Sequence, residues 1–210
     1  MGTCERMLRV GAPADAVWDW LSKPQNLFSV NIFHAEVLTD EPELRKGQVY
    51  DVDHDFFGVV QQKRQAKILE LEPCYVRWGE YKTPGAPGGR DPFPHQQSVR
   101  VVPVDDESSI LVNHISGRYV FPGSNLLGEF LFRRYMPYIL DDDNQVIAIG
   151  CGGMEPTKLH IPKGLFLWPA MVASTRFLKK STRRQVIEKM RAQRAVAPKA
   201  ESKATVGADA

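Results

Sequence analysis

A histidine within an alternating strand pattern is the residue of this chain best suited to chemistry. Residues 49–56 carry Tyr50, Val52, His54 and Phe56 on one face and Asp51, Asp53 and Asp55 on the other. This alternation predicts a half-buried antiparallel strand, with His54 on the inward face. A buried imidazole can orient a ligand oxygen or transfer a proton near neutral pH. The alternative is a structural histidine that bonds to a neighbouring strand.

Glu80 is the second candidate for catalysis. The strand predicted over 75–81 has Val76, Trp78 and Glu80 on its more apolar face. An inward Glu80 would have a raised pKa and act as an acid or base, with Trp78 as a wall of the pocket. The alternative is that the strand frays by Glu80 and its carboxylate lies in water.

Six further residues are candidates for ligand binding because they are polar or aromatic and fall in the strands and the helix around the predicted interior. They are Tyr50, Gln97, Asn113, Tyr119, Tyr135 and Tyr138. In the strand predicted over 110–121, the more apolar face contains Asn113, which leaves His114 and Arg118 outside. For the tyrosines, the alternative is a core position with the hydroxyl at a wet edge.

Metal, nucleophile and phosphate chemistry have weaker support. Strand alternation turns the three aspartates of the segment DVDHD away from His54, so these four groups cannot bind one ion. Cys4, Cys74 and Cys151 are widely spaced and include no CxxC pair. No G-x-S-x-G motif or phosphate-binding loop is present. We therefore assign no metal and no cofactor.

The elements that must position these residues follow a simple order. The pattern predicts a strand over 6–10, a helix over 13–21, and strands over 49–56, 62–72, 75–81, 97–104 and 110–121. A long helix over 126–149 follows, and Pro137 predicts a kink or a break in it. The fold class is α+β, a curved antiparallel sheet wrapped around a long C-terminal helix.

Composition and charge divide the 210 residues further. The chain is 43% hydrophobic and 10% aromatic, which is typical of a globular domain, predicted here over 1–153. A C-terminal extension over 154–194 contains a basic amphipathic helix, and 195–210 is predicted to be disordered. The formal charge is −5 for residues 1–175 and +7 for 176–210. We therefore expect the tail, and not the main domain, to bind any anionic surface. We expect no nucleic-acid partner.

Three segments carry a family resemblance. VGAPADAVWDWLSKPQNL, LRKGQVYDV and ILELEPCYVRW resemble, respectively, the first helix, the glycine followed by a strand, and the strand pair with a turn proline of the START-like (SRPBCC) superfamily. The resemblance covers roughly residues 4–149 and implies the helix-grip fold. It also implies a cavity for a hydrophobic small molecule.

Two functional hypotheses follow from the resemblance. One is a cyclase or dehydratase of the polyketide-cyclase type, in which His54 transfers the proton with Glu80 or a tyrosine. The other is a non-catalytic lipid or sterol carrier that docks on anionic membranes through its basic tail. Residues 161–194 are also a candidate contact for a protein partner. We predict a cytoplasmic protein, with peripheral membrane attachment if the carrier hypothesis holds.

Overall fold

The computed structural model describes residues 1–31, 33–34, 39, 41–56, 60–120 and 125–155. The predicted basic extension and the predicted disordered tail lie almost entirely outside the described residues.

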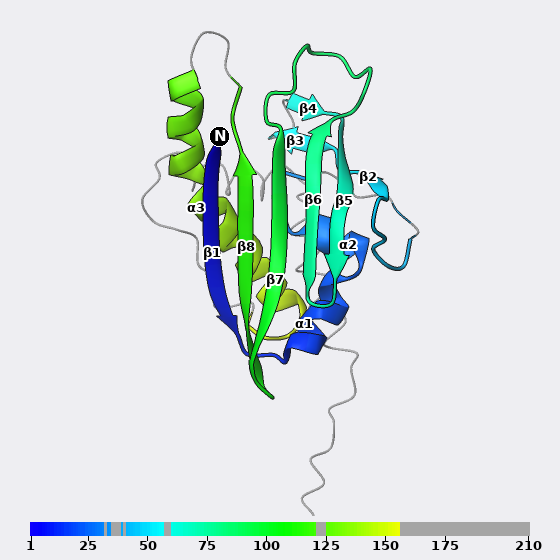
Figure 1. Cartoon of the computed structure of the whole chain (residues 1–210), viewed down its shortest axis with the longest axis vertical. Helices are drawn as coiled ribbons and strands as arrows, with labels where there is room; N and C mark the ends of the chain where they lie inside the picture. Colours follow the sequence, from blue (N-terminus) through cyan, green and yellow to red (C-terminus); the bar gives the residue numbers. More distant parts are fainter. Residues whose placement is uncertain (32, 35–38, 40, 57–59, 121–124, 156–210) are drawn as a thin grey trace, which may run out of the picture.

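A six-stranded antiparallel sheet forms the main layer, in the order β1-β8-β7-β6-β5-β2 (Figure 1). Its strands are β1 (Gly2–Val10), β2 (Val49–Asp51), β5 (Arg64–Glu72), β6 (Tyr75–Lys82), β7 (His95–Asp105) and β8 (Ser108–Gly117). Strands β5 to β8 follow one another along the chain as a meander, and β1 pairs with β8. The predicted meander is confirmed, although β7 begins earlier and β8 ends earlier than predicted.

The predicted strand over 49–56 is wrong as a single element. The chain forms β2, leaves the main sheet after Asp51, and then forms β3 (His54–Phe56), which pairs with β4 (Val60–Gln62) in a separate two-stranded sheet. At the break, an Asp53 carboxylate oxygen accepts a hydrogen bond from the backbone N–H of Arg64 at 3.2 Å, in place of a backbone carbonyl. The predicted inward face survives the break, because Tyr50, Val52 and His54 are all buried.

Two short helices follow β1. Helix α1 (Ala14–Leu21) buries Val17 and Leu21, as its amphipathic pattern predicts. Pro24 begins α2 (Pro24–Ser29), a second helix that the pattern did not predict. Proline is tolerated there because the first N–H groups of a helix have no intrahelical partner.

Helix α3 (Asn125–Gly150) is one continuous helix that contains Pro137, so of the predicted kink or break the break is wrong, and the kink stays a prediction. It lies against β1 and β8 on one face of the sheet, with α1 near its C-terminal end (Figure 1).

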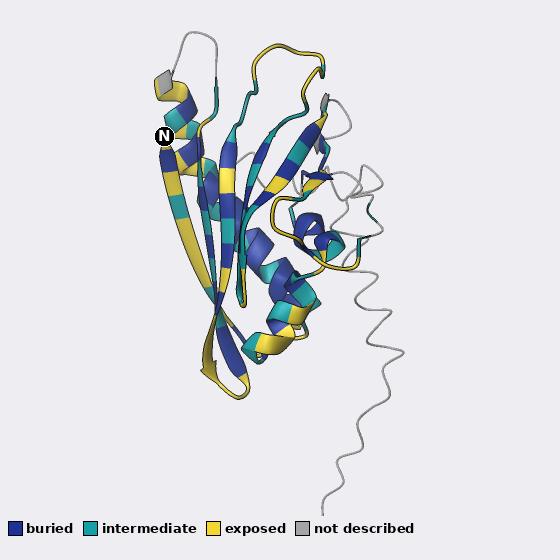
Figure 2. Cartoon of the chain, turned by 45° about the vertical axis from the view of Figure 1, so that its right-hand side comes forward, coloured by how far each residue is buried: buried dark blue, intermediate teal, exposed yellow. Residues whose placement is uncertain are grey.

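Buried apolar residues form two clusters between α3 and the sheet. Figure 2 shows the buried positions in dark blue along α3 and along the strands. The first cluster contains the C-terminal turns of α3, α1 and the centre of the sheet. The second contains Phe132, Met136, Ile139 and Leu140 of α3 with Phe33 and Ile115. Sheet and helix together therefore bury the apolar faces that neither could bury alone, as the predicted fold class requires.

Candidate functional site

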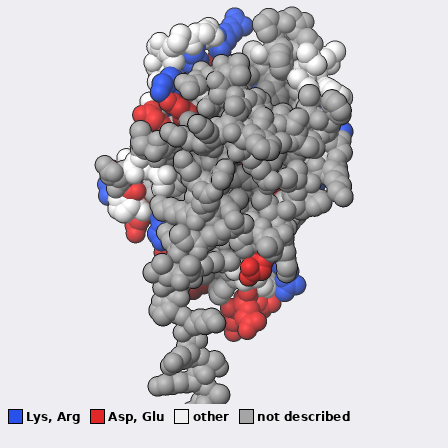
Figure 3. Space-filling model, turned by 180° about the vertical axis from the view of Figure 1, so that it is seen from behind, with Lys and Arg blue, Asp and Glu red and all other residues white. Residues whose placement is uncertain are grey.

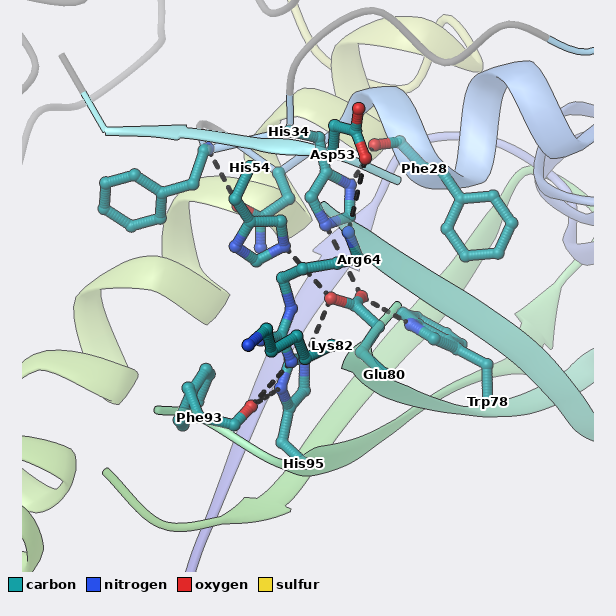
Figure 4. Close-up of polar contacts among 12 residues, drawn as sticks. Phe28, His34, Asp53, His54, Arg64, Trp78, Glu80, Lys82, Phe93 and His95 are labelled. Atoms are coloured by element: carbon teal, nitrogen blue, oxygen red, sulfur yellow. Dashed lines mark hydrogen bonds and ion pairs between the residues drawn. The ribbon is translucent and has the colours of Figure 1, made fainter. Parts of the chain in front are cut away.

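A buried carboxylate with three histidines around it is the most distinctive polar feature of the interior (Figure 4). Glu80 comes from β6 and pairs in register with His95 at the start of β7. His54 begins β3, and His34 approaches it through an isolated antiparallel bridge. The four side chains are between 1% and 5% exposed.

All three imidazoles present Nε2 to the same carboxylate. His54 Nε2 lies 3.1 Å and His95 Nε2 lies 3.4 Å from Glu80 Oε2, while His34 Nε2 lies 3.4 Å from Oε1. The indole Nε1 of Trp78 donates a hydrogen bond to Oε1 at 2.9 Å. Four nitrogen atoms therefore surround the Glu80 carboxylate.

Backbone carbonyl groups fix the orientation of two of these rings through Nδ1, the ring nitrogen that faces away from Glu80. Nδ1 of His34 donates to the carbonyl of Phe28 at 2.5 Å, and Nδ1 of His95 donates to the carbonyl of Phe93 at 2.9 Å. Since a carbonyl oxygen can only accept, Nδ1 carries the proton in both rings and Nε2 is the atom left to face Glu80.

The cluster shifts the pKa values of its members in different directions. Burial acts to raise the pKa of Glu80, but the charges of His95 and His34, together with the hydrogen bonds of His34 and His54, outweigh it and hold this pKa well below its usual range. Burial acts to lower the pKa of His34, but the charge and hydrogen bond of Glu80 and the hydrogen bond to the Phe28 carbonyl together outweigh it, and this pKa is raised. Burial, together with the charge of His34, lowers the pKa of His54 to about 3. Near neutral pH, Glu80 is therefore ionised and His54 neutral.

These findings correct two expectations about Glu80. The hypothesis that its carboxylate lies in water at a frayed strand end is wrong, because β6 continues to Lys82 and Glu80 is buried. The expected rise of its pKa is also wrong, because the sequence pattern gave no sign of the other two histidines beside it.

A buried arginine supports the cluster from one side. Arg64 of β5 is fully buried, and its guanidinium donates to Asp91 Oδ1 and to the carbonyl of Phe93, each at 2.8 Å. The Phe93 carbonyl also accepts the hydrogen bond from His95. Arg64 therefore ties the segment that precedes β7 to the site.

The predicted site residues fall into three groups. His54, Glu80 and Trp78 are in direct contact. Gln97 and Asn113 are both buried, and Gln97 Nε2 donates to Asn113 Oδ1 at 3.0 Å. As predicted, Asn113 faces inward, whereas His114 and Arg118 are not buried.

The tyrosines form the third group, and none of them contacts Glu80 through a hydrogen bond among the described residues. Tyr50 packs on Phe28 in the first hydrophobic cluster. Tyr119, Tyr135 and Tyr138 pack against the second cluster, beside α3. The ring of Tyr119 stacks on Phe93 with centroids 4.4 Å apart, and Phe93 stacks on His95 at 4.3 Å.

Sequence reasoning missed His34, His95 and Arg64 as members of the site. His95 had a usable signal, because the inward alternation of β7 through Gln97 and Val99 extends back to it. His34 had none, since it lies outside the periodic segments and reaches the site only by tertiary folding.

A depression of about 450 Å³ lies on the sheet near the site. Lys67, Leu69, Gly79, Tyr81 and Gln96 are among the residues that line it. By strand alternation these five residues point away from α3, so the depression opens on the outer face of the sheet. Glu80 and His95 also line it, so it borders the site from the side of the sheet opposite α3.

Two observations concern the surface. Seen from behind, acidic side chains gather toward the lower end of the described part (Figure 3). Among the described residues, no helix combines the length and the apolar character needed to span a membrane.

Comparison with solved structures identifies the fold. A conserved protein from Geobacillus kaustophilus matches 71% of this chain over 95% of its own length, with 14% identity and a TM-score of 0.51. The di-domain ARO/CYC protein StfQ of the steffimycin biosynthetic pathway matches 70% of this chain, with 14% identity and a TM-score of 0.52. The chain has the helix-grip fold that the sequence predicted.

The match spans 48% of StfQ, about half the length of that protein. A START superfamily protein from Mycobacterium smegmatis matches 68% of this chain over 95% of its own length, with 11% identity and a TM-score of 0.48. No protein-family model and no curated protein sequence matches the chain.

Proposed function

We propose that this START-like chain binds a hydrophobic small molecule between the sheet and α3, and that the Glu80 cluster acts on a polar group of that molecule. The observation that carries the proposal is the position of a buried charged cluster directly beside aromatic rings. His95 stacks on Phe93, Phe93 stacks on Tyr119, and Tyr119 meets Phe132 of α3 edge on. An apolar body and a polar group of one ligand would thus find matching surroundings.

An amide donor supports the proposal. Asn113 is fully buried, and its Nδ2 has no hydrogen-bond partner among the described residues. A buried donor without a partner costs about 1–3 kcal/mol, and a ligand carbonyl or hydroxyl oxygen would remove that cost. The oxygen of the same amide, Asn113 Oδ1, accepts a hydrogen bond from Gln97 Nε2.

In the proposed reaction, a cyclisation or dehydration, His54 transfers the proton. The Glu80 carboxylate fixes the ring of His54 and stabilises the positive charge that the ring gains when it takes a proton from the ligand. The surrounding aromatic walls would hold a flexible substrate in the conformation that reacts. StfQ, which has the same fold, is by its description an ARO/CYC protein, and this favours chemistry of that class.

Native mass spectrometry of the freshly purified full chain tests ligand binding. We expect a bound organic molecule that is released when the protein is denatured. With that molecule or its precursor as substrate, His54→Ala should abolish turnover while His114→Ala should not. Unchanged turnover by His54→Ala would overturn the catalytic role, and a protein that carries and accepts no apolar molecule would overturn the binding function.

Membrane docking through residues 161–194 is the second candidate, favoured by the charge of +7 on residues 176–210. These residues lie outside the described part. Each basic side chain near an anionic bilayer contributes about 1 kcal/mol. We expect phosphatidylserine vesicles to bind the full chain and not a chain cut after Thr175. Equal binding by both chains would exclude docking through the tail.

A further inference from the structure

We infer that His34, His54 and Glu80 form a binding site for a divalent transition metal ion with the ligand preferences of zinc. The inference concerns metal binding itself, so it does not rest on the proposed ligand or reaction.

The three side chains provide a plausible ligand set. Each offers one ligand atom, and the three atoms lie within 4.8 Å of one another in a buried position. Two imidazoles and one carboxylate are a common protein ligand set for zinc, which leaves a fourth position for a further ligand. The set contains no sulfur atom, so it suits zinc and other first-row divalent ions better than soft copper(I).

The distances fit a shared ion. Ligand atoms bound to tetrahedral zinc at about 2.0–2.1 Å lie about 3.3 Å apart. His54 Nε2 lies 3.1 Å from Glu80 Oε2 and His34 Nε2 lies 3.4 Å from Oε1, so each contact is close to this value, at a different oxygen atom of the carboxylate. A charge-assisted N–H···O bond measures about 2.7–2.9 Å. The Trp78 bond to the same carboxylate, at 2.9 Å, is of ordinary length, so the longer contacts are particular to the histidines.

The orientation of the His34 ring supports its role as a ligand. Its Nδ1 donates to the Phe28 carbonyl, which leaves Nε2 directed at Glu80 Oε1, 3.4 Å away. Metal-binding histidines commonly donate their other ring N–H to a backbone carbonyl, as His34 does here.

His95 has a supporting position in this arrangement. It lies 3.4 Å from Glu80 Oε2, and Phe93 fixes its ring in the same way as Phe28 fixes that of His34. It is not one of the three groups whose ligand atoms converge. We therefore assign it the role of a positioning residue that orients the Glu80 carboxylate toward the metal.

Titration of the full chain, prepared without a histidine tag, tests the inference. We expect the protein to bind one zinc ion per chain in calorimetry. Cobalt(II) in place of zinc should give the visible absorption of a tetrahedral site without a thiolate charge-transfer band. His34→Gln and His54→Gln should each weaken zinc binding at least about 100-fold, and His95→Gln about 10–100-fold, as is typical of residues that orient a ligand. His114→Gln, whose side chain lies outside the site, should bind like the wild type.

A measurement on the wild type covers the case in which a variant does not fold. In long-range ¹H–¹⁵N spectra of the imidazoles, zinc should shift the Nε2 resonances of two histidines, assigned to His34 and His54, and leave that of His114 in place. Absence of stoichiometric zinc binding, or shifts confined to other histidines, would overturn the inference. Equal zinc affinity of the wild type and of folded His34→Gln and His54→Gln would do the same.

The metal site and the proposed function fail separately. If metal-free protein binds and converts the ligand fully and binds no zinc, the metal site is wrong and the proposed function stands. If zinc binds as expected and no apolar ligand is found, the reverse holds.

Discussion

Glu80 draws its partners from three separate parts of the chain. His95 lies 15 residues after it, whereas His54 and His34 precede it and belong to a small second sheet and an irregular segment. A carboxylate this deeply buried is stable in its ionised form only when positive charge or hydrogen-bond donors surround it. The cluster therefore stabilises its own ionisation, whether protons or a metal ion lie between the nitrogen and oxygen atoms.

The pH dependence of stability at Asp91 gives a test at the scale of one residue. Burial acts to raise its pKa, but the hydrogen bonds from Arg64 and from the backbone of Phe93 and Lys82 outweigh it and lower the pKa. Since the unfolded chain then binds a proton that the folded chain does not, the contribution of Asp91 to stability is present above about pH 4 and is lost as the pH falls through the lower folded pKa.

We expect the stability difference between the wild type and Asp91→Asn to be constant near neutral pH and to shrink as the pH falls below about 4. Urea unfolding at a series of pH values measures it. A difference that stays constant to the lowest pH, or grows, would contradict the assigned ion pair.

At the scale of the element, the pairing of β7 with β8 positions the site. His95 lies opposite Gly117 in register, and a Cβ atom added to Gly117 would lie 2.6 Å from the Cβ of His95. Glycine at this position therefore allows the two strands to approach with His95 turned toward Glu80.

Gly117→Ala should destabilise the protein by about 1–3 kcal/mol, because the added methyl group overlaps His95. It should also shift the imidazole resonances of His95 in NMR spectra. Gly79→Ala is the matched control in the neighbouring strand β6, since a Cβ there meets no atom closer than 3.4 Å. Equal effects of both substitutions on the urea midpoint would show that the close approach at Gly117 does not matter.

At the scale of the whole molecule, apolar packing between the sheet and α3 holds the two layers together. Leu140 of α3 is fully buried in the second cluster. The two layers are also joined by a bidentate ion pair, in which Arg6 of β1 donates to Asp141 at 2.7 and 2.8 Å. Both side chains of this pair are partly exposed.

We therefore expect Leu140→Ala to reduce the free energy of unfolding by about 2–5 kcal/mol. Arg6→Ala should reduce it by no more than about 1 kcal/mol, because water screens a partly exposed ion pair. Chemical unfolding of the two variants makes the comparison. If Arg6→Ala were the more harmful, electrostatic attraction and not apolar burial would hold α3 to the sheet.

The sequence by itself determined the fold class, the order of the elements and the inward faces of the strands. These are local properties, because alternation places Val76, Trp78 and Glu80 on one side of β6 whatever lies around them. Pro73 located the turn between β5 and β6 in the same way. His54 and Glu80 were recognisable for the same reason, as polar residues on otherwise apolar faces.

Only the tertiary structure decided what meets Glu80. Because the chain leaves the main sheet after β2, His54 belongs to a second sheet. An isolated bridge pairs His54 with His34, which lies in a segment without periodicity. Neither contact has a local signal, since each depends on how distant segments cross in space. The direction of the Glu80 pKa was mispredicted for this reason: burial can be inferred from a pattern, but the charges that outweigh it come from residues far away in the chain.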